Sequence, residues 1–132
     1  MNTKIVMISS GLFLGVLGIT FTFIPDEIVS GLVETPSPVS ILPLQLLGAL
    51  YIGFALLNWM AKESLIGGIY NRPIAIGNFT HFAVGAMALI KIITKIQTHS
   101  EVVISLASVY VIFAILFGYV FRTSPFRTEK KN

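Results

Sequence analysis

The chain has 132 residues, of which 55% are hydrophobic and 11% are charged, and its formal net charge is +3. Soluble domains carry about 25% charged residues, so this composition excludes a soluble enzyme and a nucleic-acid-binding protein. The chain contains no cysteine, which excludes disulfides, thiolate nucleophiles and cysteine-ligated metals. Its length fits one domain, here a transmembrane domain over residues 1–132.

Four apolar stretches are long enough to cross a bilayer. A hydrocarbon core of about 30 Å requires roughly 20 apolar residues in a helix. The stretches cover residues 5–24, 41–61, 74–93 and 102–121. Backbone polar groups in lipid must bond internally, so each stretch is predicted to be helical. Because short connections make successive helices antiparallel, the predicted fold class is all-α, an integral-membrane four-helix up-down bundle.

The first apolar stretch begins after a short positive segment, as secretory signal peptides do. It is longer than the 7–15 residues that such peptides use, and no small-residue cleavage site follows at Phe23–Asp26. It is therefore predicted to be a retained helix.

The connection from Pro25 to Ser40 has features of a helix start. Proline fits the first helical position, and the acids Asp26 and Glu27 suit the positive end of a helix dipole. Apolar residues follow, and Gly31 and the segment 35–38 are expected to end the element. Two interpretations stay open: a short interfacial helix on the external surface, or a loop that dips into the headgroups.

Small residues mark candidate contact faces, because helices in lipid associate through close packing and polar contacts. Gly11 and Gly15 form a G-x-x-x-G pair, and Ala49 and Gly53 are also four residues apart. Packing within the chain is favoured for both pairs, with a homodimer contact as the alternative.

The third stretch carries a polar seam. At about 100° per residue, Gly77, Asn78, His81, Gly85 and Ala88 fall within one sector of roughly 100°. The residues expected on the other side are Phe79, Phe82, Ala83 and Ile90. A histidine at this depth is costly unless it faces a partner or water, so the seam is the leading candidate site.

Other polar residues are candidates to converge on this seam. Gln45 and Asn58 lie on the second stretch, and Tyr51, Tyr110 and Tyr119 supply hydroxyl groups. The predicted ligand-binding residues are thus His81, Asn78, Gly77, Gly85, Gln45 and Asn58. His81 has three possible roles: a hydrogen bond between helices, ligand or proton handling, and metal or haem ligation. The last is disfavoured because the other histidine, His99, falls in an external loop.

Lysine and arginine positions predict the orientation in a cell's inner (cytoplasmic) membrane. With the N-terminus in the cytoplasm, seven of the nine basic residues lie on that side and Lys91 and Lys95 on the other. The cytoplasmic seven are Lys4, Lys62, Arg72, Arg122, Arg127, Lys130 and Lys131. Both termini, including the basic tail 122–132, are therefore predicted to be cytoplasmic.

Three features point to a family resemblance: the segment Leu44–Gly53, the glycine-rich first stretch that closes at Pro25, and the basic tail. In these features the chain resembles the DoxX-like small four-helix bacterial membrane proteins. In that family an arginine often occupies the position of Gln45. The resemblance implies a four-helix membrane fold. It also implies kinship with subunits of quinone-linked oxidoreductases, with assembly helpers, or with binders of apolar ligands.

No catalytic motif is present, and all six acids lie at or beyond the edges of the apolar stretches. The leading functional hypothesis is a non-catalytic membrane protein. It binds an apolar, lipid- or quinone-like ligand beside His81, or packs as an accessory subunit of a larger membrane complex. The alternatives are an oligomeric transporter or channel subunit and a quinone-linked oxidoreductase subunit. The sequence does not identify a cofactor, and the expected partners are membrane lipid, an apolar ligand, and a membrane protein or a second copy of the chain.

Overall fold

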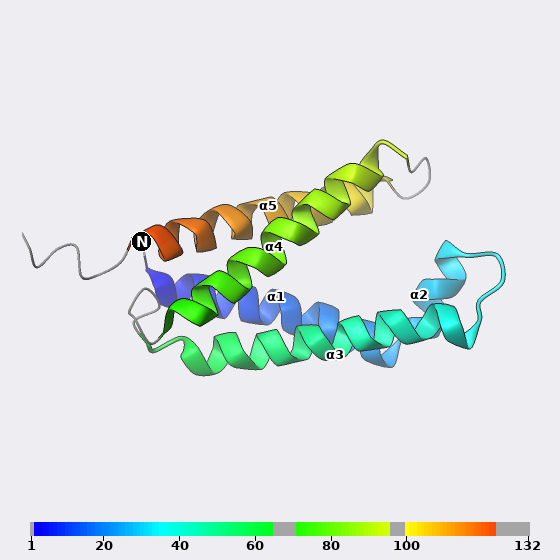
Figure 1. Cartoon of the computed structure of the whole chain (residues 1–132). Helices are drawn as coiled ribbons and strands as arrows, with labels where there is room; N and C mark the ends of the chain where they lie inside the picture. The colour runs from blue at the N-terminus through cyan, green and yellow to red at the C-terminus, as the bar shows by residue number, and fades with distance from the viewer. Residues whose placement is uncertain (1, 65–70, 96–99, 124–132) are drawn as a thin grey trace, which may run out of the picture. The chain divides into compact units, whose positions relative to one another are not determined.

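A computed structural model describes residues 2–64, 71–95 and 100–123, and these residues form an all-α structure. The helices are α1 (Thr3–Phe23), α2 (Pro25–Leu32), α3 (Pro38–Ala61), α4 (Arg72–Ile93) and α5 (Ser100–Arg122) (Figure 1). α1, α3, α4 and α5 are long and apolar enough to cross a membrane, which confirms the predicted fold class. The chain divides into two compact units, which are described separately below.

Each long helix begins two or three residues before the predicted start, because the sequence reading followed hydropathy and overlooked polar helix starts. The clearest case is α3. The Ser37 hydroxyl accepts from the Ser40 backbone N–H at 3.3 Å, and the Ser40 hydroxyl accepts from the Ser37 N–H at 3.0 Å. This capping box, with Pro38 at the first helical position, starts the helix at residue 38 instead of 41. Arg72, expected just before a helix, is the first residue of α4.

α2 confirms that the connection after α1 contains a short helix, and the loop alternative is wrong. Its buried residues are Pro25 and Val29, while Asp26 and Glu27 are exposed in the first turn. Gly31 lies inside the helix, which ends where Val33 adopts an extended conformation. Gly31 therefore does not end α2. The helix continues through Leu32 and ends because Val33 leaves helical geometry.

α2 packs against the first half of α3 within the unit formed by residues 7–62. A cavity of about 320 Å³ lies between them, lined by Val29, Leu32, Leu44 and Leu47 among others. α3 carries Pro43 in its interior, which removes one backbone N–H from the helix here.

α1 and α3 run antiparallel with their backbones in close contact. A Cβ added to Gly48 would lie 2.8 Å from the Thr22 backbone nitrogen and 2.9 Å from the Gly18 carbonyl oxygen. Nearer the other end, a Cβ on Gly11 would lie 3.2 Å from the Ala55 carbonyl oxygen, and one on Gly15 would lie 3.6 Å from the Ala55 Cβ. Intrachain packing is therefore confirmed for the Gly11–Gly15 pair.

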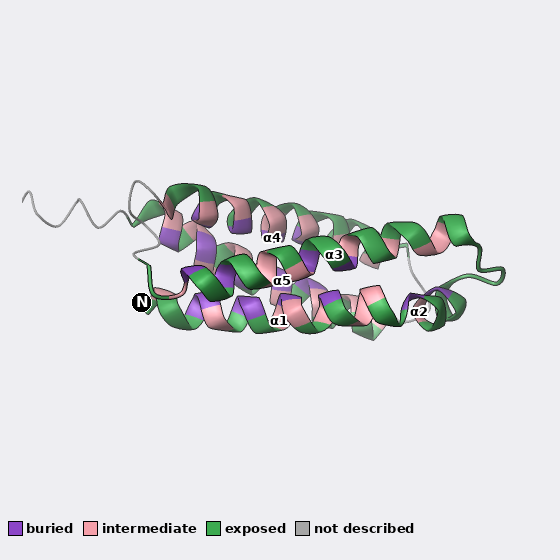
Figure 2. Cartoon of the chain, turned by 90° about the horizontal axis from the view of Figure 1, so that it is seen from below, coloured by how far each residue is buried: buried purple, intermediate pink, exposed green. Residues whose placement is uncertain are grey.

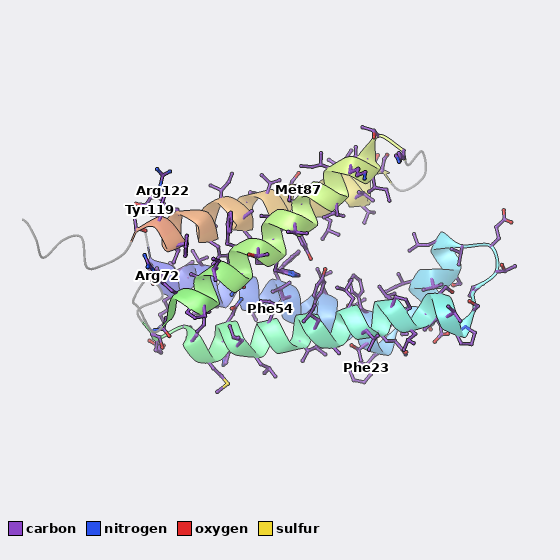
Figure 3. All side chains as sticks on the ribbon, in the orientation of Figure 1. Phe23, Phe54, Arg72, Met87, Tyr119 and Arg122 are labelled. Carbon is purple, nitrogen blue, oxygen red and sulfur yellow. The ribbon has the colours of Figure 1, made fainter. Side chains whose placement is uncertain are left out.

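α4 and α5 form the second helical hairpin (Figure 1). Phe79 of α4 lies beside Gly118 of α5, where an added Cβ would be 3.2 Å from the phenylalanine ring. At one end of the hairpin the Arg72 guanidinium lies 5.7 Å from the centroid of the Phe121 ring. Figure 3 shows Arg72 and Arg122 at this same end, so the start of α4 and the end of α5 present their positive charges together.

The same unit includes the first residues of α1. There Lys4 Nζ lies 2.7 Å from Glu63 Oε1, just after the end of α3. The pair is largely exposed, so we assign it little stabilisation.

Large apolar side chains cover the outside of the helices. Val39 and Met60 are each 81% exposed and Phe23 is 75% exposed, and exposed residues occur on every long helix (Figure 2). So much exposed apolar surface is unfavourable in water and ordinary in lipid. The chain is thus a multi-pass membrane protein.

Candidate functional site

The predicted seam of α4 lies at one edge of the buried face of that helix. Asn78 is fully buried, whereas Gly77, His81 and Gly85 are half-buried and Ala88 is exposed. The buried residues of α4 are Ala75, Asn78, Phe82 and Ala86. The seam therefore places its imidazole at the border of the packed interior instead of its centre.

Phe82 corrects the expectation that aromatic residues of α4 lie away from the seam. It is only about 40° from Asn78 on the helix, and its exposed fraction is 0%. Sorting the residues of α4 by polarity alone places Phe82 on the side opposite the seam. In lipid the free energy of an apolar side chain differs little between the outside and the inside of the protein, so packing decides its position.

Phe82 is the centre of the contact between α4 and α5. Its ring centroid lies 5.2 Å from that of Tyr110, 4.8 Å from Phe113 and 5.8 Å from Phe117. Tyr110, Phe113 and Phe117 follow one another at helical spacing on α5 and are all buried. We call these four residues the aromatic cluster. Interlocking rings of this kind hold two helices through dispersion and ring electrostatics.

His81 adjoins the aromatic cluster. Its ring centroid lies 5.0 Å from that of Phe82, edge to face, and 5.6 Å from that of Tyr110. Its Nε2 lies 3.5 Å from the Tyr110 hydroxyl oxygen. That separation is at the long limit of a hydrogen bond. Two polar atoms from different helices therefore meet within an otherwise aromatic contact.

Gly85 allows Tyr110 to reach this position. A Cβ added to Gly85 would lie 2.7 Å from Tyr110 Cδ1 and closer still to Cε1. The tyrosine ring thus rests on the bare backbone of α4, one turn from His81. Tyr110 of α5, which was expected only to supply a hydroxyl group, therefore contacts both predicted site residues, His81 and Gly85.

Asn78 satisfies part of its amide within its own helix. Its Nδ2 donates to the Ile74 carbonyl oxygen at 3.0 Å, four residues earlier. Because the side chain is fully buried, this bond lowers the cost of placing an amide in an apolar interior. Gly77, directly before it, is half-buried and supplies no side chain.

Asn58 and Gln45 belong to the other unit. Asn58 is fully buried, and its Nδ2 donates to the Ser10 hydroxyl of α1 at 3.0 Å. Gln45 is exposed on α3. Asn58 therefore joins α1 to α3, a contact whose serine partner the sequence reading missed. Convergence of Asn58 and Gln45 on His81 stays a prediction, as does a ligand role for the six predicted residues.

Within the described ranges, the structure contains no group of three or more histidine or acidic side chains able to hold a metal. His99, Tyr70 and residues 124–132 of the predicted cytoplasmic tail lie outside the described residues. The chemistry of the α4–α5 site is that of one imidazole and one phenol, which can donate to or accept from a neutral polar group.

Comparison with models of protein families, with curated proteins and with solved structures found no match for this chain. The DoxX-like resemblance therefore stays a prediction.

Proposed function

We propose that the chain is a non-catalytic protein of the inner membrane that binds an apolar ligand carrying a polar group, such as a quinone or a lipid with a hydroxyl. The observation that carries the proposal is the pair formed by His81 Nε2 and the Tyr110 hydroxyl, 3.5 Å apart in an aromatic contact. A carbonyl or hydroxyl group of a ligand can bond to the half-buried imidazole, beside which the buried Tyr110 hydroxyl lies. The apolar body of such a ligand suits aromatic and aliphatic surroundings.

The aromatic cluster supports a ligand role over a purely structural one for the pair. Phe82 and its three aromatic partners already join α4 to α5 through stacked and edge-to-face rings. A long His81–Tyr110 contact adds little to that packing, because hydrogen bonds weaken at such distances. His81 is also half-buried while Phe82 is fully buried, so its ring has accessible surface that a ligand can contact.

The orientation is part of the proposal. Arg72 and Arg122 share one end of the α4–α5 hairpin (Figure 3), and positive residues favour the cytoplasmic side. This arrangement supports cytoplasmic N- and C-termini. We also propose membership of the DoxX-like group, on the strength of the segment Leu44–Gly53 and the glycine-rich α1.

The experiment is solvent extraction and mass spectrometry of whatever co-purifies with the full chain in native lipid. Tyr110→Phe is the sharpest variant, because it removes the hydroxyl and keeps the ring that packs on Gly85. The matched control is Tyr119→Phe, whose ring is 52% exposed on the same helix. We expect one apolar species to be retained by the wild type and by Tyr119→Phe, and to be lost from Tyr110→Phe and His81→Leu.

Two results would overturn the proposal. One is retention of the same species by Tyr110→Phe and His81→Leu, which would move the ligand elsewhere. The other is purification without any enriched small molecule but with a stoichiometric membrane-protein partner. That outcome would favour the accessory-subunit hypothesis.

A further inference from the structure

A groove of about 370 Å³ runs along the α1–α3 hairpin, in the unit that does not contain His81. Its floor is made by Gly11 and Gly15 of α1 and by Ala55 of α3. The groove exists because glycine has no side chain at the positions where α1 approaches α3. All the residues that line it are apolar.

The groove begins at Trp59 and extends toward Ile52 on α3. Seven residues separate the two, which is about 10 Å along a helix axis, or about one third of the hydrocarbon thickness. This length matches the upper part of one lipid acyl chain. It is too short for a molecule that spans the membrane.

A positive charge is held at the Trp59 end. Lys62 Nζ lies 3.5 Å from the centroid of the Trp59 ring, a cation–π contact that restrains the ammonium group there. The neighbouring acid, Glu63, pairs instead with Lys4 at 2.7 Å. The acids of the unit formed by residues 7–62 are Asp26, Glu27 and Glu34, which lie on or just after α2, at the other end of the α1–α3 hairpin from Lys62.

From this combination we infer that the α1–α3 groove is a binding site for an anionic phospholipid. One acyl chain lies on the glycine floor, and the phosphate headgroup meets Lys62 beside Trp59. The indole of Trp59 suits this depth, because tryptophan favours the boundary between headgroups and hydrocarbon. An ammonium group at that boundary attracts anionic headgroups over zwitterionic ones.

A second copy of the chain is the competing occupant, since Gly11 and Gly15 form a G-x-x-x-G pair. However, both glycines already face Ala55 of the same chain, at 3.2 Å and 3.6 Å from their added Cβ positions. Close approach of backbones is what that motif provides, and here α3 uses it.

Trp59 is the single tryptophan of the chain, so tryptophan fluorescence reports on the Trp59 end of the groove. The protein is reconstituted in phosphatidylcholine vesicles containing a small fraction of phospholipid brominated near the headgroup end of its acyl chains. Bromine quenches tryptophan on contact. We expect brominated phosphatidylglycerol to quench Trp59 roughly fivefold more than brominated phosphatidylcholine at the same fraction, as an attraction to one lysine implies.

Two pairs of variants test the two halves of the site. Lys62→Gln should bring quenching by the two lipids to the same level, while Lys91→Gln, on exposed α4 surface, should leave the preference unchanged. Leu12→Phe places a ring in the groove from a side chain that is 58% exposed, and should reduce quenching by both lipids. Leu50→Phe adds the same bulk at a residue that is 51% exposed and does not line the groove, and should change nothing.

Equal quenching of the wild type by the two lipids would overturn the inference, and so would a Leu12→Phe protein quenched like Leu50→Phe. A wild-type dimer that Leu12→Phe converts to a monomer, measured by light scattering in nanodiscs, would assign the groove to a second copy instead. None of these readouts depends on His81 or Tyr110, so the inference and the proposed function fail separately.

Discussion

The two hairpins join their helices by different means. α1 and α3 meet backbone to backbone, with Gly18 and Gly48 at the closest point. α4 and α5 meet through ring packing centred on Phe82, with one glycine, Gly85, accommodating a tyrosine. Helices in lipid cannot rely on the hydrophobic effect to associate, so each hairpin shows one of the remaining solutions. The first leaves little space for a side chain to move, whereas the second consists of side chains that can rotate.

This difference predicts that a methyl group will be most costly at Gly48. Its Cβ in Gly48→Ala would lie 2.8 Å from the Thr22 backbone nitrogen, and two backbones cannot yield as a side chain can. We expect a loss of about 3 kcal/mol in the free energy of unfolding, at the upper end for overpacking. Unfolding in mixed micelles of increasing denaturing detergent measures it.

Gly53→Ala is the control, on the same helix five residues later. A Cβ there meets no atom within 4 Å, so its stability should equal that of the wild type or exceed it slightly, because alanine is the better helix former. Equal stabilities of the two alanine variants would show that α1 and α3 do not depend on their close approach.

The second largest effect is expected for Phe82→Ala. Removing this ring deletes its three aromatic contacts with α5 at once. In water-soluble cores such a change costs about 3–5 kcal/mol. Part of that value is transfer from water, which is absent here, so we expect about 2 kcal/mol in the same unfolding assay.

Phe23→Ala controls for the loss of a phenylalanine from a site that is 75% exposed (Figure 3). It should be nearly neutral in a bilayer. If the Phe82→Ala protein were as stable as the Phe23→Ala protein, the aromatic cluster would not be the cause of α4–α5 association.

Hydropathy was sufficient to predict the four long helices and the all-α class, because the cost of unpaired backbone groups in lipid dominates every other preference. It did not predict where α3 begins, since that depends on a reciprocal bond between Ser37 and Ser40. The S-x-x-S spacing before an apolar run was the available signal. The start of α3 is thus set by short-range hydrogen bonds that an average over hydropathy does not detect.

The candidate site was predicted less completely than the fold. Helical spacing placed Gly77, Asn78, His81 and Gly85 on one side of α4, and the structure brings His81 and Gly85 to Tyr110. Phe82 was missed because polarity does not distinguish a position that faces lipid from one that faces an apolar protein interior. The spacing of Tyr110, Phe113 and Phe117 on α5 was the signal that an aromatic partner belongs on α4.

A smaller effect is expected for Gly85→Ala. The added methyl group meets the ring of Tyr110 at 2.7 Å from Cδ1, but a ring can rotate where a backbone cannot. We expect a loss of about 1 kcal/mol in the free energy of unfolding, at the low end for overpacking. Combining it with Tyr110→Ala removes the obstructing ring, so in that background the alanine at residue 85 should cost nothing. If the penalty persists there, the contact with Tyr110 does not cause it.

The smallest effect concerns the polar contact of the α1–α3 hairpin, the bond from Asn58 Nδ2 to the Ser10 hydroxyl at 3.0 Å. Both side chains are fully buried, yet such bonds in membrane proteins average only about 0.6 kcal/mol, because the unfolded chain in lipid finds other partners. A double-mutant cycle of Asn58→Ala and Ser10→Ala should give a coupling free energy near that value. Pairing Asn58→Ala with Ser108→Ala, whose hydroxyl donates only to the Ile104 carbonyl of its own helix, should give none. A coupling free energy well above the loss of stability caused by Gly48→Ala would reverse the comparison. The Asn58 amide, and not the close backbone approach, would then hold α1 to α3.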